Sequence, residues 1–273
     1  MSSTGPSSTP NQCGVQVVNS TASSGSIVRS SSPSISRDPG FVLELADGTR
    51  EMARRVLLAT GMEYRFPALP GIVERWGRSV FHCPFCHGWE VRDQPLGVLD
   101  RGATGVHRAL LLRVWSDDVT LLADGPAELD AEDAERLRAA GVTVDERRVA
   151  ELRGPDSALT TVAFADGSER SCGGLLVPVT LHQRSALAEH LGAAAAGPGP
   201  IAVDAVEVDR MLHTSVPGLS AAGDVSAEMP SVANAVAAGS SAAAMIVGGL
   251  MSEAHGLTPV GATLLGSNST RSA

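Results

Sequence analysis

Residues 96–122 read LGVLDRGATGVHRALLLRVWSDDVTLL, and this stretch decides the fold. An apolar run at 96–99 is followed by Gly102 and Gly105, a leucine-rich segment at 110–112 and a second apolar run at 119–122. A strand, a glycine turn, a helix and a second strand in this order are typical of a dinucleotide-binding βαβ unit. The stretch therefore predicts an α/β, Rossmann-like fold.

Two strand-rich passages flank this unit and share one layout, in which a strand, an Asp-Gly turn and a second strand follow one another. These elements are 41–45, 47–48 and 56–59 in the first passage and 162–164, 166–167 and 175–177 in the second. Asp166 lies 119 residues after Asp47, and the apolar positions stay in step through that offset. We expect two copies of one supersecondary unit, one in each of two Rossmann-like, three-layer nucleotide-binding domains.

The composition excludes several classes of protein. The net charge is −9, from 30 acidic and 21 basic residues, which argues against a nucleic-acid partner or an anionic membrane. Four cysteines in 273 residues are too few for a secreted disulfide framework, so a cytoplasmic location is expected. The uncharged stretch at 231–250 is rich in Ala, Gly and Ser, which predicts a buried helix of small residues rather than a membrane span.

The strongest local motif is FHCPFCHGWE at residues 81–90. A CxxC with proline in its second position suits the first turn of a helix, where Cys83 and Cys86 can cycle between dithiol and disulfide. His87 follows the second sulfur and is a candidate proton donor or acceptor for that exchange. Two alternatives are a zinc half-site and two structural thiols. Zinc needs two further ligands, and Cys13 and Cys172 stand alone in the sequence.

These motifs, in this order, resemble the low-molecular-weight thioredoxin reductases, from residue 41 to about residue 255. The shared motifs are ATG at 59–61, CPFCHGWE at 83–90, the βαβ unit, TSVPG at 214–218 and AGDV at 222–225. The CPFCHG form looks most like the branch of dithiol oxidases that close disulfides in natural products. The resemblance implies an NAD(P)- and FAD-dependent oxidoreductase that acts on a small-molecule or protein dithiol or disulfide, and a homodimer is also expected.

The resemblance also implies roles for individual residues. Cys83 would be the exchanging thiol and Cys86 the one facing the flavin. Asp224 matches the family's contact to the flavin ribityl chain, and the helix after Pro230 matches the one that faces the flavin ring. Thr60, Gly61 and Gly223 would belong to the same FAD site. Without the family, Gly223 and Asp224 are only a turn at a strand end.

Two positions of the nucleotide-binding unit depart from the family pattern. Asp100 stands where the glycine loop should begin with glycine, and its carboxylate would repel a pyrophosphate unless Arg101 offsets the charge. Gly102 and Gly105 keep the rest of the loop. Asp124 follows the second strand with no basic residue between positions 114 and 135, so it suits a ribose hydroxyl and predicts NADH over NADPH. The alternative is a loop aspartate beside a turn glycine.

The largest departure is at the N-terminus. Counting back 119 residues from Gly102 puts the FAD-pyrophosphate loop before Met1, and residues 1–38 form a serine-rich stretch that we expect to be disordered.

The expected domains are an incomplete FAD domain at 39–77 and 185–255, an NAD(P) domain at 78–184 and a flexible tail at 256–273. Without their central strand, the strands near 56–58 and 216–219 should expose their edges, and FAD should bind poorly. The chain is therefore either a flavin-linked disulfide oxidoreductase or a catalytically silent remnant.

Overall fold

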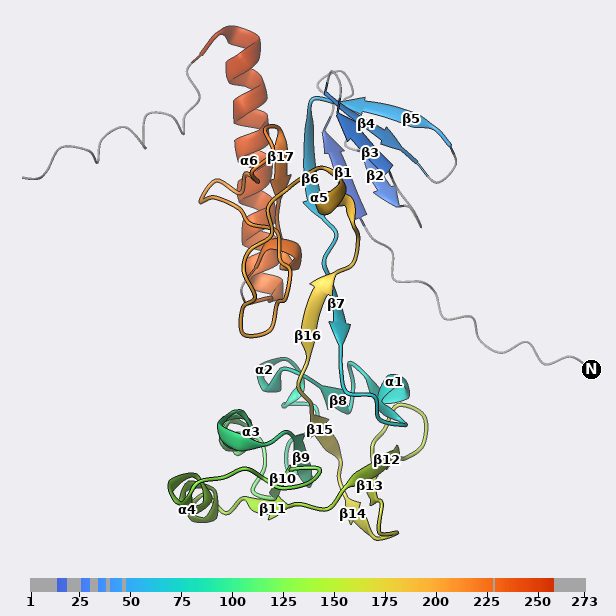
Figure 1. Ribbon diagram of the computed structural model, residues 1–273, viewed down its shortest axis with the longest axis vertical. Coiled ribbons are helices and arrows are strands. Elements are labelled where there is room, and N and C mark those ends of the chain that lie inside the picture. The colour runs from blue at the N-terminus through green and yellow to red at the C-terminus, as the bar shows by residue number, and fades with distance from the viewer. Residues whose placement is uncertain are drawn as a thin grey trace, which may run out of the picture. The chain divides into compact units, whose positions relative to one another are not determined.

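The computed structural model describes residues 14–18, 26–29, 34–37, 40–45, 48–227 and 229–257 (Figure 1). The chain divides into a first unit, Met1–Tyr64 with Thr180–Ala273, and a second unit, Arg65–Val179. The two compact units thus change at 64/65 and 179/180, whereas the domain boundaries expected from the sequence are 77/78 and 184/185. The reason is packing, because Ile72 lies in an apolar core of the second unit, with Phe66 and Trp76 against it.

The second unit contains the nucleotide-binding fold expected from the sequence. Its five-stranded sheet has the order β11-β10-β9-β15-β8, and each neighbouring pair is parallel. The strands are β8 (Val80–Phe81), β9 (Leu96–Leu99), β10 (Val119–Leu122), β11 (Thr143–Asp145) and β15 (Gly174–Leu176). Helix α3 (Gly102–Leu112) joins β9 to β10, and α4 (Ala131–Ala139) joins β10 to β11. A parallel sheet of this kind has its ligand sites at the carboxyl ends of its strands.

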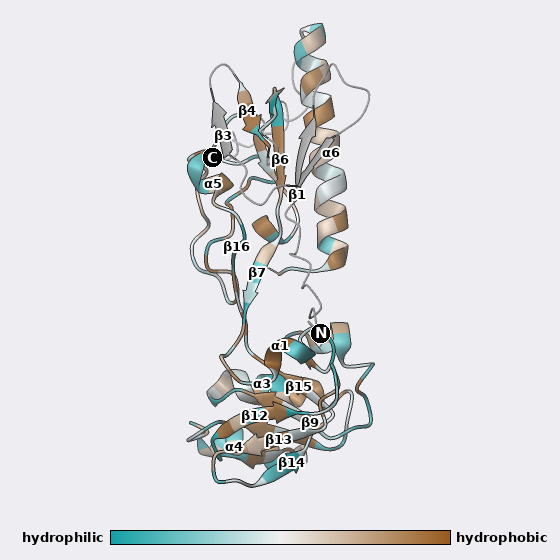
Figure 2. Ribbon diagram, turned by 90° about the vertical axis from the view of Figure 1, so that its right-hand side faces the viewer, coloured by the Kyte–Doolittle hydropathy of each residue, from teal (hydrophilic) through white to brown (hydrophobic). Residues whose placement is uncertain are grey.

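Both faces of this parallel sheet are covered by apolar packing. On one side Val98, Leu121 and Leu176 form a core with Ala109 and Leu112 of α3, and all five are fully buried. The other core includes Leu175 and residues of a three-stranded antiparallel sheet. That sheet comprises β12 (Val149–Arg153), β13 (Thr161–Phe164) and β14 (Glu169–Ser171). Figure 2 shows the hydrophobic colouring of β9, β13 and β15, as expected for strands buried between layers.

The repeat expected from the sequence is confirmed. In the first unit β4 (Phe41–Glu44) and β5 (Arg50–Ala53) form a hairpin that leads into β6 (Arg55–Ala59). Moved along by 119 residues, these strands coincide with β13, β14 and β15 to within one or two residues. The Asp47 of the first turn lies outside the described residues, whereas Gly48 donates its N–H to the Leu45 carbonyl.

The first unit differs from expectation in the neighbours of β6. Strand β17 (Leu219–Ala221) pairs with β6 directly and in parallel, so no central strand is needed between them. On its other side β6 pairs with β1 (Gly14–Val18), which runs antiparallel and continues to β2 (Ser26–Arg29). The expectation of an exposed edge is therefore wrong for β6, whereas β17 is the last strand of this sheet in the described part of the chain.

Part of the serine-rich stretch is also more ordered than its composition predicts. Strands β1, β2 and β3 (Ser34–Arg37) lie inside 1–38, where disorder was expected, and β3 pairs with β4. The expectation fails there because strand pairing uses backbone groups, which serine and glycine supply as well as any residue. The rest of 1–38, and residues 258–273 of the expected flexible tail, lie outside the described residues.

Helix α6 (Val232–His255) is less buried than the sequence predicts. Ala242, Ile246, Leu250 and Ser252 are its buried residues, whereas Val232 and Val236 are 83% and 68% exposed. The inner face packs against Leu57 of β6. By length and composition alone α6 is also long and apolar enough to cross a membrane, which is weak evidence when it rests on one helix. The expectation of a buried helix is thus wrong for all but one face.

Two short strands lie where the chain leaves the first unit and returns to it. Strand β7 (Met62–Arg65) follows β6 and pairs with β16 (Thr180–Gln183), where the chain returns from the second unit. Helices α1 (Ile72–Arg75), α2 (Pro84–His87) and α5 (Leu187–His190) are single turns. Ala202 forms one isolated bridge with Leu181 of β16.

Candidate functional site

The two cysteines of the CxxC motif lie on the single helical turn α2, after strand β8. Cys83 is the N-cap residue and Pro84 takes the first helical position, as the motif predicts. The Sγ atoms of Cys83 and Cys86 are 2.8 Å apart, with the Cys86 thiol donating a hydrogen bond to Cys83. Both are free thiols. Because sulfurs on neighbouring turn positions already touch, a small side-chain rotation brings them to bonding distance.

The contact between the sulfurs makes them chemically unequal. Partial burial and the hydrogen bond to Cys83 raise the pKa of the Cys86 thiol to about 11, and the charge of Glu90 acts in the same direction. A thiol that keeps its proton and donates it to a neighbouring sulfur stabilises a thiolate on that neighbour.

Two histidines flank the pair, and the sequence argument identified only one of them. His87 stacks on Phe81, with ring centroids 5.9 Å apart, and its buried Nδ1 has no hydrogen-bond partner in the described part of the chain. His82 stacks on Trp76 at 5.9 Å. Burial, together with the charges of His87 and Arg108, lowers the pKa of His82. The proton-transfer role of His87 stays a prediction, because its ring is held by stacking rather than by a sulfur.

Close packing requires the glycine of the CPFCHG motif, which is Gly88. A Cβ at this position would lie 2.4 Å from the Pro84 carbonyl oxygen and 2.4 Å from the Trp115 indole ring. Trp115, just after α3, also meets Trp89 edge to face, with ring centroids 6.2 Å apart. Trp115 was not among the predicted site residues. In the sequence it stands out only as an aromatic residue just after the βαβ helix. Its ring positions α2 and therefore both sulfurs.

The zinc alternative finds no support in the described residues. They contain no group of three or more His, Cys, Asp and Glu side chains placed to hold a metal ion. Cys172 is fully enclosed, its thiol donates to the Gly174 carbonyl, and burial raises its pKa to about 12. Cys13 lies outside the described residues.

At the end of β10, the surroundings of Asp124 differ from the expectation. Its Oδ1 accepts the Val149 N–H at 2.8 Å, and its Oδ2 lies 3.5 Å from the Arg148 guanidinium. Arg101 donates to the Asp124 carbonyl at 3.3 Å. The sequence has no basic residue between positions 114 and 135, but the fold brings Arg101 and Arg148 to Asp124 from outside that segment. The preference for NADH over NADPH stays a prediction.

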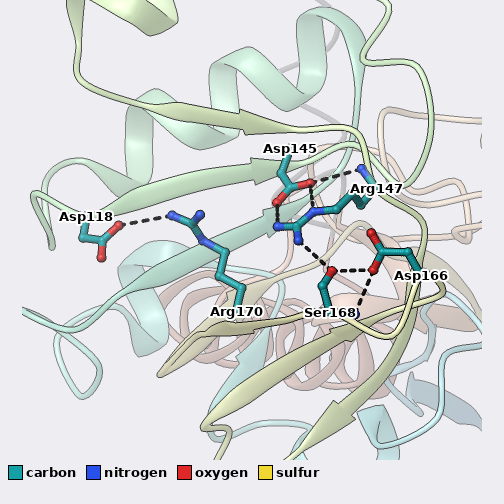
Figure 3. A network of polar contacts seen from close by, with 6 residues as sticks. All are labelled: Asp118, Asp145, Arg147, Asp166, Ser168 and Arg170. Atoms are coloured by element: carbon teal, nitrogen blue, oxygen red, sulfur yellow. Dashed lines mark hydrogen bonds and ion pairs between the residues drawn. The ribbon is translucent and has the colours of Figure 1, made fainter.

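Arg147, which precedes Arg148, hydrogen-bonds to residues away from Asp124. Its Nε donates to Asp145 Oδ1 at 2.9 Å and its Nη1 to Ser168 Oγ at 2.7 Å, and Ser168 in turn donates to Asp166 (Figure 3). This network joins β11 to the hairpin turn of β13 and β14. Arg147 therefore has a structural role and is not available to a nucleotide.

In the first unit, the residues expected around the flavin come together at one edge. Thr60 and Gly61 follow β6, and Gly223 and Asp224 follow β17. Because β6 and β17 are adjacent and parallel, both pairs leave the sheet at its carboxyl edge. The Tyr64 hydroxyl donates to Asp224 Oδ2 at 3.4 Å. Burial raises the pKa of Asp224, against the opposing effects of Tyr64 and Arg184, two neighbours that the sequence argument missed.

FAD needs more than this edge, since its pyrophosphate is held by a strand, a glycine turn and the helix behind it. In the second unit β15 pairs with β9, and β9 leads into a glycine turn and helix α3. In the first unit the equivalent neighbour of β6 is β1, which is antiparallel and leads to β2. The described residues of the first unit therefore keep the sheet edge where the flavin was expected, but they do not form the strand, turn and helix that the pyrophosphate needs.

Comparisons with known proteins agree on one kind of relative. The model of the pyridine nucleotide-disulphide oxidoreductase family matches residues 11–239. The chain is 32% identical to thioredoxin reductase tcpT of Claviceps purpurea, over 78% of this chain and 68% of that one. It is 30% identical to thioredoxin reductase sirT of Leptosphaeria maculans, over 76% and 66% of the two chains. The chain thus spans about two thirds of the length of these relatives.

Solved structures give the same result. An oxidoreductase from Agrobacterium tumefaciens superimposes with a TM-score of 0.73 at 33% identity, over 82% of this chain and 73% of that one. The structure of HlmI superimposes with a TM-score of 0.70 at 34% identity, over 86% and 72% of the two chains. The α/β fold with its parallel sheet is shared with these proteins.

Proposed function

The chain belongs to the pyridine nucleotide-disulphide oxidoreductase family, and we propose that its Cys83–Cys86 pair exchanges electrons with a dithiol or disulfide substrate. The observation that carries the proposal is the hydrogen bond from the Cys86 thiol to the Cys83 sulfur. It supports Cys83 as the sulfur that attacks and Cys86 as the one that resolves. The relatives named as thioredoxin reductases support a disulfide-containing partner, either a protein or a small molecule.

The exchange is balanced within the pair and its substrate. The Cys83 thiolate attacks one sulfur of the substrate disulfide, forms a mixed disulfide and releases the other substrate sulfur as a thiolate, which takes up a proton. Cys86 then loses its proton and attacks the Cys83 sulfur, which closes the Cys83–Cys86 disulfide and releases the second substrate thiol. The substrate gains two electrons and the pair loses two. A dithiol substrate reverses each step and reduces the pair.

The role of Cys86 follows from its raised pKa. A thiol with a pKa of about 11 is almost wholly protonated at neutral pH, so it rarely attacks an external disulfide. Once Cys83 is held in a mixed disulfide, the hydrogen bond that the Cys86 thiol donates to the Cys83 sulfur is lost. Attack on an adjacent sulfur is then intramolecular and favoured by proximity.

Cofactors are a separate question. The family name refers to pyridine nucleotides, and Thr60, Gly61, Gly223 and Asp224, the residues expected at the flavin, follow two adjacent strands of the first unit. The described residues do not form the pyrophosphate half of an FAD site, so the proposed exchange does not pass through FAD. The proposal is therefore a stoichiometric exchange that the cysteine pair performs by itself.

The rival proposal is a catalytically silent relative that keeps the fold alone. It is favoured by the antiparallel neighbour of β6 and by Asp100 in the glycine loop. The two proposals differ in the reactivity of one sulfur. A silent relative has no reason to react faster at Cys83 than at Cys86.

An aromatic disulfide such as 5,5′-dithiobis(2-nitrobenzoate) distinguishes them, used on the reduced full chain at neutral pH. Each protein carries Cys13→Ser so that Cys172 is the only cysteine besides the pair, and buried Cys172 serves as the internal background. The parent should release two equivalents of chromophore and close its disulfide. Cys86→Ser should stop at one equivalent with the adduct on Cys83, and Cys83→Ser should react severalfold more slowly. Equal rates for the two single variants would contradict the assignment and favour the silent relative.

A further inference from the structure

The glycine turn between β9 and α3 has the backbone of a nucleotide-binding loop. Gly102 has a φ of 57°, and a Cβ on Gly105 would lie 3.2 Å from the carbonyl carbon of Asp100. The first position needs the left-handed conformation that glycine adopts readily, and the second lets α3 approach the end of β9. Backbone shape therefore does not exclude a dinucleotide.

The side chain of Asp100 already binds a backbone N–H and an arginine that could otherwise bind a phosphate at this turn. Its Oδ1 accepts the N–H of Arg101 at 2.8 Å, and its Oδ2 is paired with Arg108 of α3. The side chain is only 13% exposed. Phosphate groups at such turns are held by backbone N–H groups and by a nearby cation, which are the two partners that Asp100 already has. The carboxylate thus acts as an internal anion.

A second donor of the turn is also taken. The Gly102 N–H donates to the Ala127 carbonyl at 2.9 Å, and the Ala127 N–H donates to Glu146 Oε1 at 2.8 Å. Ala127 is 4% exposed. The segment after β10 therefore lies against the glycine turn and is held there by Glu146.

The remaining cation beside the turn is engaged as well. Arg101 lies 3.5 Å from the Glu128 carboxylate and donates to the Asp124 carbonyl. An incoming pyrophosphate would meet the negative charges of Asp100 and Glu128 at the mouth of the site, with both nearby arginines already paired.

We infer that Asp100 excludes the pyrophosphate of NADH and NADPH from this turn by occupying its anion position. The family's nucleotide does not fit the residues present at the loop. This inference goes beyond the proposed exchange at Cys83 and Cys86, because it concerns a different loop and its test reads binding rather than disulfide chemistry.

Asp100→Gly is the variant that tests the inference, with titration calorimetry of the full chain against NADH and against NADPH. The wild-type chain should show no binding of either nucleotide up to about 1 mM, whereas Asp100→Gly should bind at least about tenfold more tightly. Protection of amides 100–105 from hydrogen exchange should place the nucleotide at the turn. Asp93→Gly is the matched control, because Asp93 is 88% exposed with a φ of 61°, and it should behave as wild type.

Asp100→Asn is a second variant in case Asp100→Gly fails to fold. It keeps an acceptor for the Arg101 N–H and removes only the charge. It should bind the nucleotides more tightly than wild type and less tightly than Asp100→Gly. Micromolar binding of NADH or NADPH by the wild-type chain at this loop overturns the inference. So does an Asp100→Asn chain with the wild-type circular dichroism spectrum that binds no more tightly than wild type.

Discussion

The hairpin-and-strand unit occurs once in each half of the molecule, and the two copies differ in the strand beside them. In the second copy β15 pairs in parallel with β9, which leads into a glycine turn and α3. In the first copy β6 pairs with the antiparallel β1, which leads to another strand. Backbone pairing alone can thus complete a sheet, but a phosphate site also requires the turn and helix that follow a parallel strand.

The largest expected difference between the copies is in the cost of removing a matched leucine. Leu57 of β6 and Leu176 of β15 occupy equivalent positions 119 residues apart, and both are buried. Leu176 lies among large side chains on both the sheet and α3, whereas the cluster around Leu57 contains two alanines. We expect Leu176→Ala to lower the free energy of unfolding by about 3–5 kcal/mol and Leu57→Ala by about 2–3 kcal/mol.

Urea unfolding, with hydrogen exchange followed separately in peptides of each unit, measures both values. The local exchange identifies which unit each substitution loosens. If Leu57→Ala costs as much as Leu176→Ala, the first copy is as well packed as the second and the comparison fails.

A smaller effect should come from the polar network of the second copy, where Arg147 joins Asp145 to the hairpin turn (Figure 3). The hydrogen bond from Arg147 lowers the pKa of Asp145 despite its burial. The stabilisation is therefore present above the ordinary aspartate pKa of about 3.9 and is lost as the pH falls through the lowered value. Asp145→Asn should lower the free energy of unfolding by about 1 kcal/mol at neutral pH, since Arg147 is partly exposed.

The pH dependence gives this prediction its control. The difference between wild type and Asp145→Asn should shrink as the solution is acidified below the lowered pKa. Asp118→Asn breaks the exposed ion pair with Arg170, also drawn in Figure 3, and should change stability little at any pH. A gap between wild type and Asp145→Asn that is the same at acid and neutral pH would mean that the ion pair does not stabilise the network.

Much of the fold followed from local sequence. Strands β9 and β10, helix α3 and the repeat were all found, because apolar runs and turn glycines report local structure directly. Strand β1 was missed, because its pairing with β6 depends on partners about 40 residues away in sequence. The burial of α6 was overstated for a related reason, since composition does not say how many faces of a helix are covered.

The candidate site was predictable where a motif carries it. The pairing of Cys83 with Cys86 on one turn follows from the CxxC spacing. The glycine turn before α3 follows from a different motif, the βαβ unit. Side chains that reach the site from other loops left no local signal. Trp115 behind α2, Arg148 beside Asp124 and Tyr64 beside Asp224 became visible only through the packing of the folded chain.

The redox state of Cys83 and Cys86 tests the central claim most directly. The full chain is treated with a dithiol oxidant such as diamide, free thiols are alkylated, the protein is reduced, and newly freed thiols receive a second label for mass spectrometry. The account predicts that both cysteines carry the second label, that their peptides were joined before reduction, and that a reductant reverses this state. Full first labelling of both thiols after oxidation would contradict it.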